Sequence, residues 1–316
     1  MKMILDLDTG IDDALAVAYA LGHEEIELLG ITTSFGNVTV DKAVKNSIDI
    51  LDLFGQNDIP VFKGSDVPWG MDSYVPSENI QHIHGENGLG NIDLGVSSRR
   101  ESPISAIDFM IQAAHEYGNL LTVVTTGPLT NLAEAIKKDR AAIEKIGKIV
   151  VMGGALTVPG NVTSFAEANI FNDAHAAKFV LESDIPLVIV GLDITLKTML
   201  TGKDIQTWQS LSTKAAQAVT AFTTYYYQNE YDHSEFGGAL HDPLAVEVAV
   251  NPEIVTDYLP INLTVETKGA STGRTIAALP RLNDTEKSAQ IGLDVKGQDF
   301  VQRFTETVYR LLEAAK

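Results

Sequence analysis

The sequence contains no cysteine among its 316 residues, and this absence removes several kinds of chemistry. Disulfide bonds, thiolate nucleophiles and zinc sites built from cysteine are all excluded. A chain of this length can bury a core that needs no covalent staple. Because a cysteine-free chain fits a reducing compartment, we expect a cytoplasmic protein.

Positive charge is scarce, since 23 lysine and arginine residues face 42 aspartate and glutamate residues, for a formal net charge of −19. Such a chain repels phosphate backbones and anionic lipid, so we expect neither nucleic acid nor a membrane surface as a partner. Long hydrophobic runs are also missing. The longest apolar stretches, near residues 149–156 and 185–192, are too short to cross a bilayer. The first residues leave no room for the apolar region of a signal peptide. We therefore expect a soluble protein.

Short apolar runs rich in β-branched residues alternate with amphipathic helical patterns along the chain. The predicted strands are residues 3–7, 26–33, 59–62, 120–125, 149–152 and 187–190. The predicted helices are residues 12–21, 40–54, 104–117, 129–138 and 174–182. This alternation predicts a Rossmann-like α/β fold, with a mostly parallel central sheet and helices on both faces.

No linker or internal repeat divides the sequence, so we expect one domain over residues 1–316. Residues 65–100 are rich in Gly, Asn and Ser, which predicts a long loop. Shorter strands are expected near residues 261–265 and 275–278, before a final helix over residues 298–315.

The opening of the chain places four carboxylates, Asp6, Asp8, Asp12 and Asp13, within eight residues. Helix capping explains Asp12 and Asp13 but leaves the other two without a role. If three of these groups converged at about 5 Å, each pair would repel by about 3 kcal/mol at an effective dielectric near 20. Either the carboxylates stay apart or a cation holds them together. Carboxylate oxygens favour a hard ion, Ca²⁺ or Mg²⁺.

Two further polar clusters lie downstream. His241 and Asp242 precede Pro243 and an apolar run, a pattern that suits either a site or a turn before a helix. Asn161, with Glu167 and Asn169 close behind, offers short polar groups that suit recognition of hydroxyls, although an ordinary polar loop has the same composition.

Taken together, these motifs resemble the inosine-uridine-preferring nucleoside hydrolases. The resemblance runs from residue 3 to about residue 250, and the order and spacing of the motifs make it specific. The motifs that carry it are Asp6-Leu7-Asp8-Thr9-Gly10-Ile11-Asp12-Asp13, Gly36-Asn37, His84-Gly85-Glu86-Asn87-Gly88-Leu89, Thr126-Gly127-Pro128-Leu129-Thr130-Asn131, Met152-Gly153-Gly154, Asn161 with Glu167 and Asn169, Leu192-Asp193-Ile194-Thr195 and His241-Asp242-Pro243.

The resemblance implies hydrolysis of the N-glycosidic bond of purine or pyrimidine ribonucleosides, giving ribose and free base in nucleoside salvage. It also implies a homodimer or homotetramer. The implied Ca²⁺ ligands are Asp8, Asp13, the carbonyl of Thr126, and Asp242. By the same matching, Asp8 activates the attacking water. The residues implied to hold the ribose are Asp12, Asn37, Asn161, Glu167 and Asn169.

The departing base needs a proton or a hydrogen bond, and His241 and His84 are the candidates because histidine titrates near neutrality. Tyr227 and Tyr231 lie one helical turn apart and could contact the base, although tyrosines at this spacing are often part of a core. The two tryptophans, Trp69 and Trp208, lie away from His84 in sequence, so a base stacked between tryptophans finds no support.

Two alternatives remain open at this point. Asp6 and Asp8 also match the paired aspartates of haloacid dehalogenase-type phosphohydrolases, although the late glycine–aspartate run of those enzymes has no convincing counterpart. A non-catalytic, Ca²⁺-dependent binder of ribose or nucleoside would share every sugar and metal residue. Only Asp8 and the two histidines favour turnover over binding.

Overall fold

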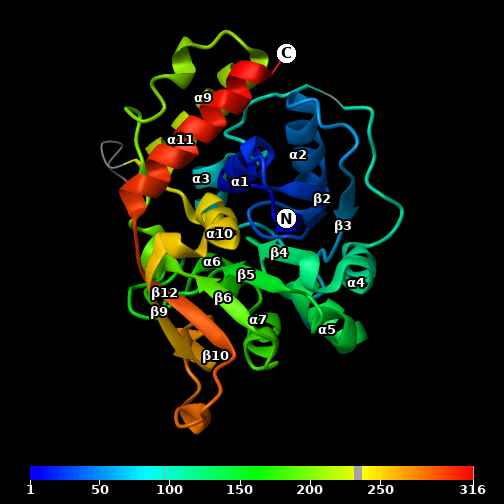
Figure 1. Cartoon of the computed structure of the whole chain (residues 1–316), viewed down its shortest axis with the longest axis vertical. Coiled ribbons are helices and arrows are strands. Elements are labelled where there is room, and N and C mark those ends of the chain that lie inside the picture. Colours follow the sequence, from blue (N-terminus) through cyan, green and yellow to red (C-terminus); the bar gives the residue numbers. More distant parts are fainter. Residues whose placement is uncertain (96, 231–236, 316) are drawn as a thin grey trace.

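The fold, taken from a computed structural model that describes residues 1–95, 97–230 and 237–315, is built on an eight-stranded sheet (Figure 1). Its strand order is β3-β2-β1-β4-β5-β6-β12-β9. All neighbouring pairs are parallel except β12 with β9. The strands are β1 (Lys2–Leu7), β2 (Glu27–Thr33), β3 (Val61–Lys63), β4 (Leu121–Thr125), β5 (Lys148–Met152), β6 (Leu187–Val190), β9 (Val255–Ile261) and β12 (Ala289–Val295). The predicted α/β class is confirmed.

Helices cover both faces of the sheet, as predicted. Met3 and Leu5 of β1 belong to one apolar core, whereas Ile4 between them belongs to the other, because successive strand residues point to opposite faces. The helices packed in the first core are α1 (Ile11–Gly22), α2 (Val40–Leu53), α9 (Lys214–Asn229), α10 (His241–Val250) and α11 (Gly297–Ala314). Those in the second are α4 (Ala106–Tyr117), α5 (Thr130–Ile143) and α7 (Ala174–Leu181).

The prediction of a loop over residues 65–100 was wrong in one part, because a short helix, α3 (Glu78–His84), lies inside it. Ser77 begins this helix by accepting a hydrogen bond from the Ile80 amide (3.2 Å). Gly85 ends it with a φ of 78°, a conformation that favours glycine. Five of its seven residues are polar, which hid the helical period. The helix places its last residue, His84, beside the start of α1, at the carboxyl ends of the parallel strands.

The end of the chain also differs from its prediction. The single strand expected over residues 261–265 is two strands, because β9 ends at Ile261 and β10 (Leu263–Val265) pairs with β11 (Thr275–Ala277) in a separate hairpin. The antiparallel edge formed by β9 and β12 was not predicted. None of the helices in the described ranges is long and apolar enough to span a membrane.

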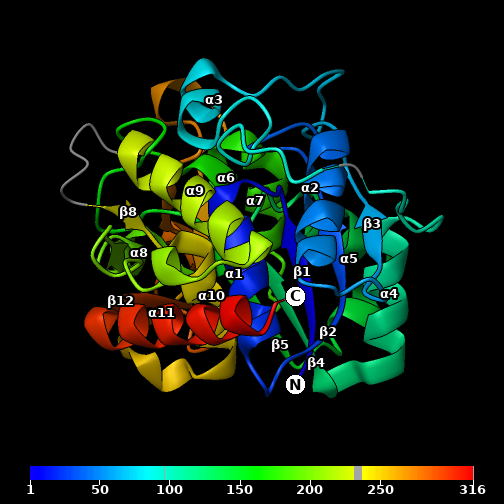
Figure 2. The same cartoon turned by 90° about the horizontal axis from the view of Figure 1, so that it is seen from above.

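The parallel strands leave their carboxyl ends along one edge of the sheet, where ligands of such folds bind. Helix α1 begins four residues after β1 ends, and α10 begins beside it with His241. The view from above shows α1 and α10 next to each other over the middle of the sheet (Figure 2). Residues far apart in sequence therefore meet at this edge.

Candidate active site

Asp8 lies directly after β1 and is completely buried. Its Oδ2 accepts a hydrogen bond from the backbone N–H of Asn37 (2.6 Å), and its Oδ1 accepts one from the Asn37 side-chain amide (3.2 Å). Gly36 makes this contact possible, since a Cβ at that position would lie 1.8 Å from Asp8 Oδ2. The Gly36-Asn37 motif therefore orients the Asp8 carboxylate from both sides.

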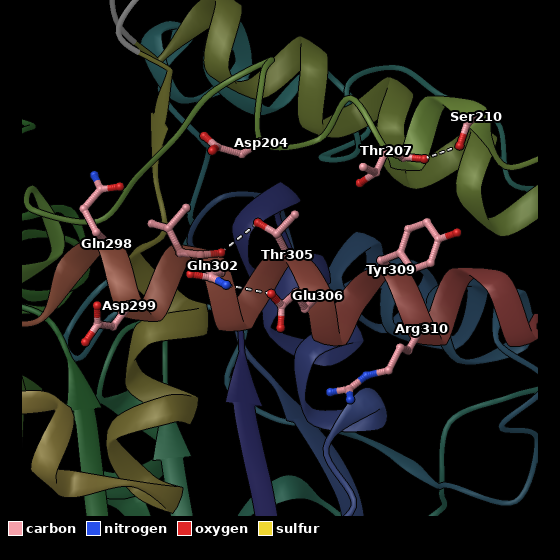
Figure 3. A pocket seen from close by; sticks show the side chains of 11 residues that line it. Asp204, Thr207, Ser210, Gln298, Asp299, Gln302, Thr305, Glu306, Tyr309 and Arg310 are labelled. Carbon is pink, nitrogen blue, oxygen red and sulfur yellow. Dashed lines mark hydrogen bonds between the residues drawn. The ribbon is translucent and has the colours of Figure 1, made fainter.

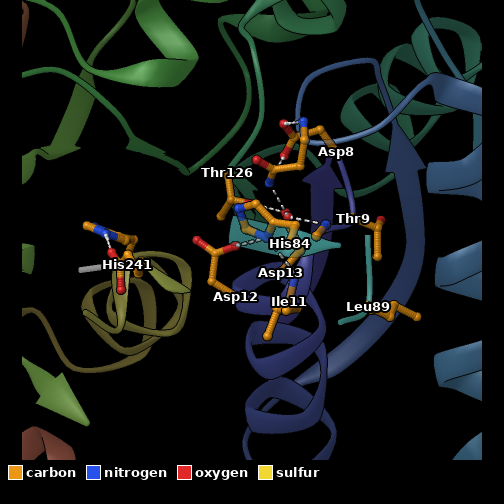
Figure 4. Close-up of polar contacts among 12 residues, drawn as sticks. Asp8, Thr9, Ile11, Asp12, Asp13, His84, Leu89, Thr126 and His241 are labelled. Carbon is orange, nitrogen blue, oxygen red and sulfur yellow. Dashed lines mark hydrogen bonds and ion pairs between the residues drawn. The ribbon is translucent and has the colours of Figure 1, made fainter. Parts of the chain in front are cut away.

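Three more carboxylates converge beside Asp8, at the first turns of α1 and α10. Figure 4 shows two of them, Asp12 and Asp13, near Asp8. One oxygen from each of Asp12, Asp13 and Asp242 lies within 4.8 Å of the others, and all three residues are buried. Asp8 adjoins this group, because the Asn37 amide that bonds Asp8 also lies 3.2 Å from Asp13 Oδ2. Asp8, Asp12, Asp13 and Asp242 thus share one site, whereas Asp6 is hydrogen-bonded to Thr32 and Asn131 instead.

The hydrogen bonds of these acids differ. Asp13 accepts from the Gly10 backbone N–H (2.8 Å) and from the Thr126 hydroxyl (2.7 Å). Asp12 Oδ1 and Asp242 Oδ2, in contrast, are buried without a hydrogen-bond partner. A buried anionic oxygen without a partner is costly, so both atoms call for a ligand from outside the chain. Asp242 Oδ2 fits a cation, and Asp12 Oδ1 fits a cation or the hydroxyl of a bound sugar.

Burial and mutual repulsion perturb the acids strongly. Burial, with the charge of Asp13, raises the pKa of Asp12 to about 7. The same two causes raise the pKa of Asp8 well above its ordinary value, and burial with the charge of Asp12 does so for Asp242. Four carboxylates cannot all be ionised here at neutral pH without compensating positive charge. The electrostatics therefore agree with the unpartnered oxygens in calling for a cation.

His84 closes α3 and points into the same site (Figure 4). Its Nδ1 accepts a hydrogen bond from the Ile11 backbone N–H (3.1 Å), which leaves the ring proton on Nε2. Burial and the charge of His241 lower the pKa of His84 to about 3. His84 is therefore a neutral ring that can donate a hydrogen bond but does not carry a positive charge.

His241 has the opposite environment. Its Nδ1 lies 2.8 Å from Thr195 Oγ1, and its Nε2 lies 2.9 Å from Glu230 Oε1. Burial alone would lower the pKa of His241, but the hydrogen bond and charge of Glu230 outweigh burial and raise it. Glu230 is itself held by the Ala239 backbone N–H (2.8 Å). The sequence did not reveal Glu230, because nothing local marks the acid that follows α9 (Lys214–Asn229) as the partner of His241.

Three of the five residues predicted to hold the ribose, Asn161, Glu167 and Asn169, lie together on the loop and helix that follow β5. Glu167 caps α6 (Ala168–Asn172) by accepting from the Asn169 and Ile170 backbone N–H groups (2.9 and 3.1 Å). The Asn169 side-chain amide donates to the Thr126 carbonyl (2.6 Å), which joins this helix to the predicted metal ligand. Asn161 accepts from the Ala168 backbone N–H (3.0 Å). Capping thus fixes these polar side chains.

One cavity of about 560 Å³ is lined both by acids of the cluster and by the two histidines. Residues predicted for the site that line it are Asp12, Asn37, His84, Thr126, Asn161, Glu167, Asn169, His241 and Asp242. Tyr226 also lines it, with its ring centroid 5.5 Å from that of His84. Tyr227 does not, because its hydroxyl is turned toward Gly202. Tyr231 lies outside the described residues.

A second hollow, of about 690 Å³, lies between α11 and the segment around η2 (Trp208–Ser210), as Figure 3 shows. Although larger, it contains none of the predicted site residues. Its charged side chains include Asp204, which bonds Thr201, and Glu306, which bonds Gln302. The smaller cavity over the buried acids is the better candidate for an active site.

Comparison with known proteins gives a consistent result. A family model described as inosine-uridine preferring nucleoside hydrolase matches residues 3–302. The chain is 36% identical to uridine nucleosidase 1 of Arabidopsis thaliana over 87% of this chain and 81% of that one. It is 35% identical to the pyrimidine-specific ribonucleoside hydrolase RihA of Salmonella gallinarum over 97% of both. A solved purine-preferring ribonucleoside hydrolase from Gardnerella vaginalis is 43% identical, covers all of both chains and has a TM-score of 0.96.

Proposed function

Because the chain belongs to the inosine-uridine preferring nucleoside hydrolase family, we propose that it cleaves the N-glycosidic bond of purine ribonucleosides, pyrimidine ribonucleosides or both, with Ca²⁺ as its metal ion. Membership makes it an N-ribosyl hydrolase acting on ribonucleosides, which sets aside both the phosphohydrolase and the non-catalytic binder. The observation that carries the proposal is the pair of buried, unpartnered oxygens on Asp12 and Asp242, beside a cavity that also holds His84 and His241.

The donor set supports Ca²⁺. We assign Asp8, Asp13, the Thr126 carbonyl and Asp242 as the ligands; all are oxygen donors, and Asp13 and Asp242 belong to the converging group. Together with sugar hydroxyls they offer the seven or eight flexible oxygens that Ca²⁺ takes, whereas Mg²⁺ prefers a tight octahedron. When bound, the ion supplies a Lewis acid that makes a neighbouring water more acidic.

Asp8 is the proposed general base. Asn37 holds the Asp8 carboxylate in a single orientation beside the proposed cation site, through both oxygens. The proton of the attacking water goes to Oδ1, which holds only the longer of the two Asn37 hydrogen bonds. Asp12, Asn37, Asn161, Glu167 and Asn169 bind the ribose. The acidic surroundings lower the energy of a positively charged ribosyl transition state.

The two histidines have different roles at the leaving base: His84 donates a hydrogen bond and His241 donates a proton. His84 donates a hydrogen bond from Nε2, since its Nδ1 is occupied and its low pKa keeps the ring neutral. His241 is the proton source, because Glu230 stabilises its charged form. Tyr226 supplies an aromatic face at this end of the cavity, the role that the sequence suggested for Tyr227 and Tyr231.

Four further assignments concern the metabolic role, the compartment, the domain organisation and the assembly of the protein. Release of a reusable base and ribose suits nucleoside salvage, and we propose a single-domain cytoplasmic enzyme that assembles as a homodimer or homotetramer. Light scattering coupled to gel filtration distinguishes those two assemblies. A monomer under conditions of full activity would contradict the assignment of either.

The activity is tested by absorbance. Purified protein with Ca²⁺ should release hypoxanthine from inosine, uracil from uridine, or both, with ribose formed in equal amount. The two substrates together report the base preference, on which the purine-preferring and pyrimidine-specific relatives differ. A phosphate ester such as p-nitrophenyl phosphate serves as the control and should stay intact. Binding of nucleoside with no release of base would contradict the proposal.

A further inference from the structure

Below the active site, a buried ionic group joins three helices. Glu247 of α10 is completely buried. Its Oε2 accepts a hydrogen bond from the Tyr19 hydroxyl of α1 (2.6 Å), and its Oε1 accepts one from Arg303 of α11 (2.5 Å). Asn251 adds a further hydrogen bond to Oε1 (3.1 Å). Both carboxylate oxygens are therefore satisfied, unlike those of the acids above.

Tyr19 is fixed as firmly as Glu247. Its side chain is fully buried, and its ring packs against Phe300 and Phe304 of α11 with centroids 5.9 and 5.5 Å away. Burial and the charge of Glu247 raise the pKa of Tyr19, so its hydroxyl stays a donor. A buried carboxylate with three donors is costly to assemble and strongly disrupted when one partner is removed.

Tyr19 and Glu247 lie on the same two helices as the acid cluster, a short distance along each helix. Tyr19 follows Asp12 by seven residues on α1, two helical turns on the same face and roughly 10 Å along the axis. Glu247 follows Asp242 by five residues on α10, roughly 7.5 Å along its axis. The two helices pack side by side (Figures 1 and 2). The acid cluster lies at the first turn of each.

Repulsion acts at the beginning of these two helices. Without a cation, Asp12 and Asp13 on α1 face Asp242 on α10, so any negative charge that two or more of them carry pushes the helix ends apart. The Tyr19–Glu247 hydrogen bond joins the same two helices about two turns below. Arg303, which is itself partly exposed, links the pair to α11 through an ion pair with the buried Glu247 carboxylate, so separating the helices would leave that carboxylate with fewer partners.

We propose that Glu247, together with Tyr19 and Arg303, is a positioning group that holds α1 and α10 at the separation the cation site requires. The inference rests on the proposed cation site. Holding the ligands in place before the ion arrives removes part of the cost of binding. The group touches neither substrate nor ion and acts only through the helices.

The test measures Ca²⁺ binding by the full chain without nucleoside. Tyr19→Phe removes one hydroxyl and keeps the ring packing, so the variant should fold. We expect its Kd for Ca²⁺, measured by titration calorimetry, to rise about tenfold, in the range seen when groups that support metal ligands are removed. Glu247→Gln should act in the same direction. The rise in melting temperature produced by Ca²⁺ should shrink in both variants.

Val180→Ala is the matched control. Val180 is fully buried in α7, in the other core, so its truncation should lower the melting temperature while leaving the Kd unchanged. If Tyr19→Phe lowers the melting temperature but binds Ca²⁺ like the wild type, the group is merely structural and the proposal is overturned. Absence of Ca²⁺ binding by the wild type would overturn the cation site itself, and the inference with it.

Discussion

The two ends of the cavity satisfy their charges in different ways. At the acid end, Asp12 and Asp242 each bury an oxygen without a partner. At the histidine end, both nitrogens of His241 have protein partners, Thr195 and Glu230. The acid end is therefore complete only with a ligand from outside, whereas the histidine end is complete within the chain. Stability and activity should therefore depend on the dissolved cation at the acid end and on protein side chains at the histidine end.

Removal of the cation should produce the largest effect, because it acts on the end that needs an outside ligand. Chelation is expected to abolish turnover and to lower the melting temperature, while circular dichroism stays that of a folded protein. An ion that binds only the folded state stabilises it by about 2.7 kcal/mol at one hundred times its Kd. Calorimetry and a base-release assay before and after adding Ca²⁺ check both effects. Full activity in the verified absence of metal would show that the acid end needs no cation and so does not differ from the histidine end in this respect.

Asp8→Asn should give the next largest effect, and it tests whether Asp8 at the acid end is the general base. The amide keeps the shape of the carboxylate but cannot take up a proton, so turnover should fall by about 10²–10⁴. Nucleoside should still bind, because the ribose-binding residues are unchanged. Steady-state kinetics and equilibrium binding of inosine measure the two quantities. Turnover close to that of the wild type would rule out Asp8 as the base.

His241→Ala tests the histidine end through the leaving group. Turnover of inosine should fall by about 10²-fold or more, because the departing base loses its proton source. p-Nitrophenyl riboside releases a stable anion and should lose far less. The ratio of the two rates is the readout. Equal losses on both substrates would show that His241 contacts the sugar or supports the fold.

Glu230→Gln should give the smallest effect, confined to pH. Glu230 raises the pKa of His241, so the charged ring is retained to higher pH in the wild type. Without that charge the pKa falls, and the decline of inosine turnover on the alkaline side should begin at a lower pH. The pH profile of kcat for inosine measures this shift, and p-nitrophenyl riboside provides the control. An unchanged profile would mean that Glu230 does not tune His241.

The difference between the ends also decides what the sequence could predict. Asp8, Asp12 and Asp13 fall at a strand end and a helix start, positions that the apolar periodicity locates without any tertiary information. Asp242 lies far along the chain but again begins a helix before an apolar run. The acid end was therefore predictable, as were the parallel sheet and its helices.

The histidine end depends on contacts that no local pattern encodes. Glu230 reaches His241 from the end of α9, and α3 places His84 over Ile11 across 73 residues of sequence. The choice between Tyr226 and Tyr227 depends on the rotation of α9, which a run of three tyrosines leaves undetermined. Antiparallel pairing of β9 with β12 likewise depends on long-range register.

The junction of α1 with α10 has a consequence for the order of synthesis. Asp13 leaves the ribosome 229 residues before Asp242. At about 5–20 residues per second, that interval lasts roughly 10–45 s. During this time the early acids stand without their last partner and stay hydrated. The proposed cation site therefore stays incomplete until nearly four fifths of the chain has been made, and a product terminated before Asp242 should show neither ion binding nor base release.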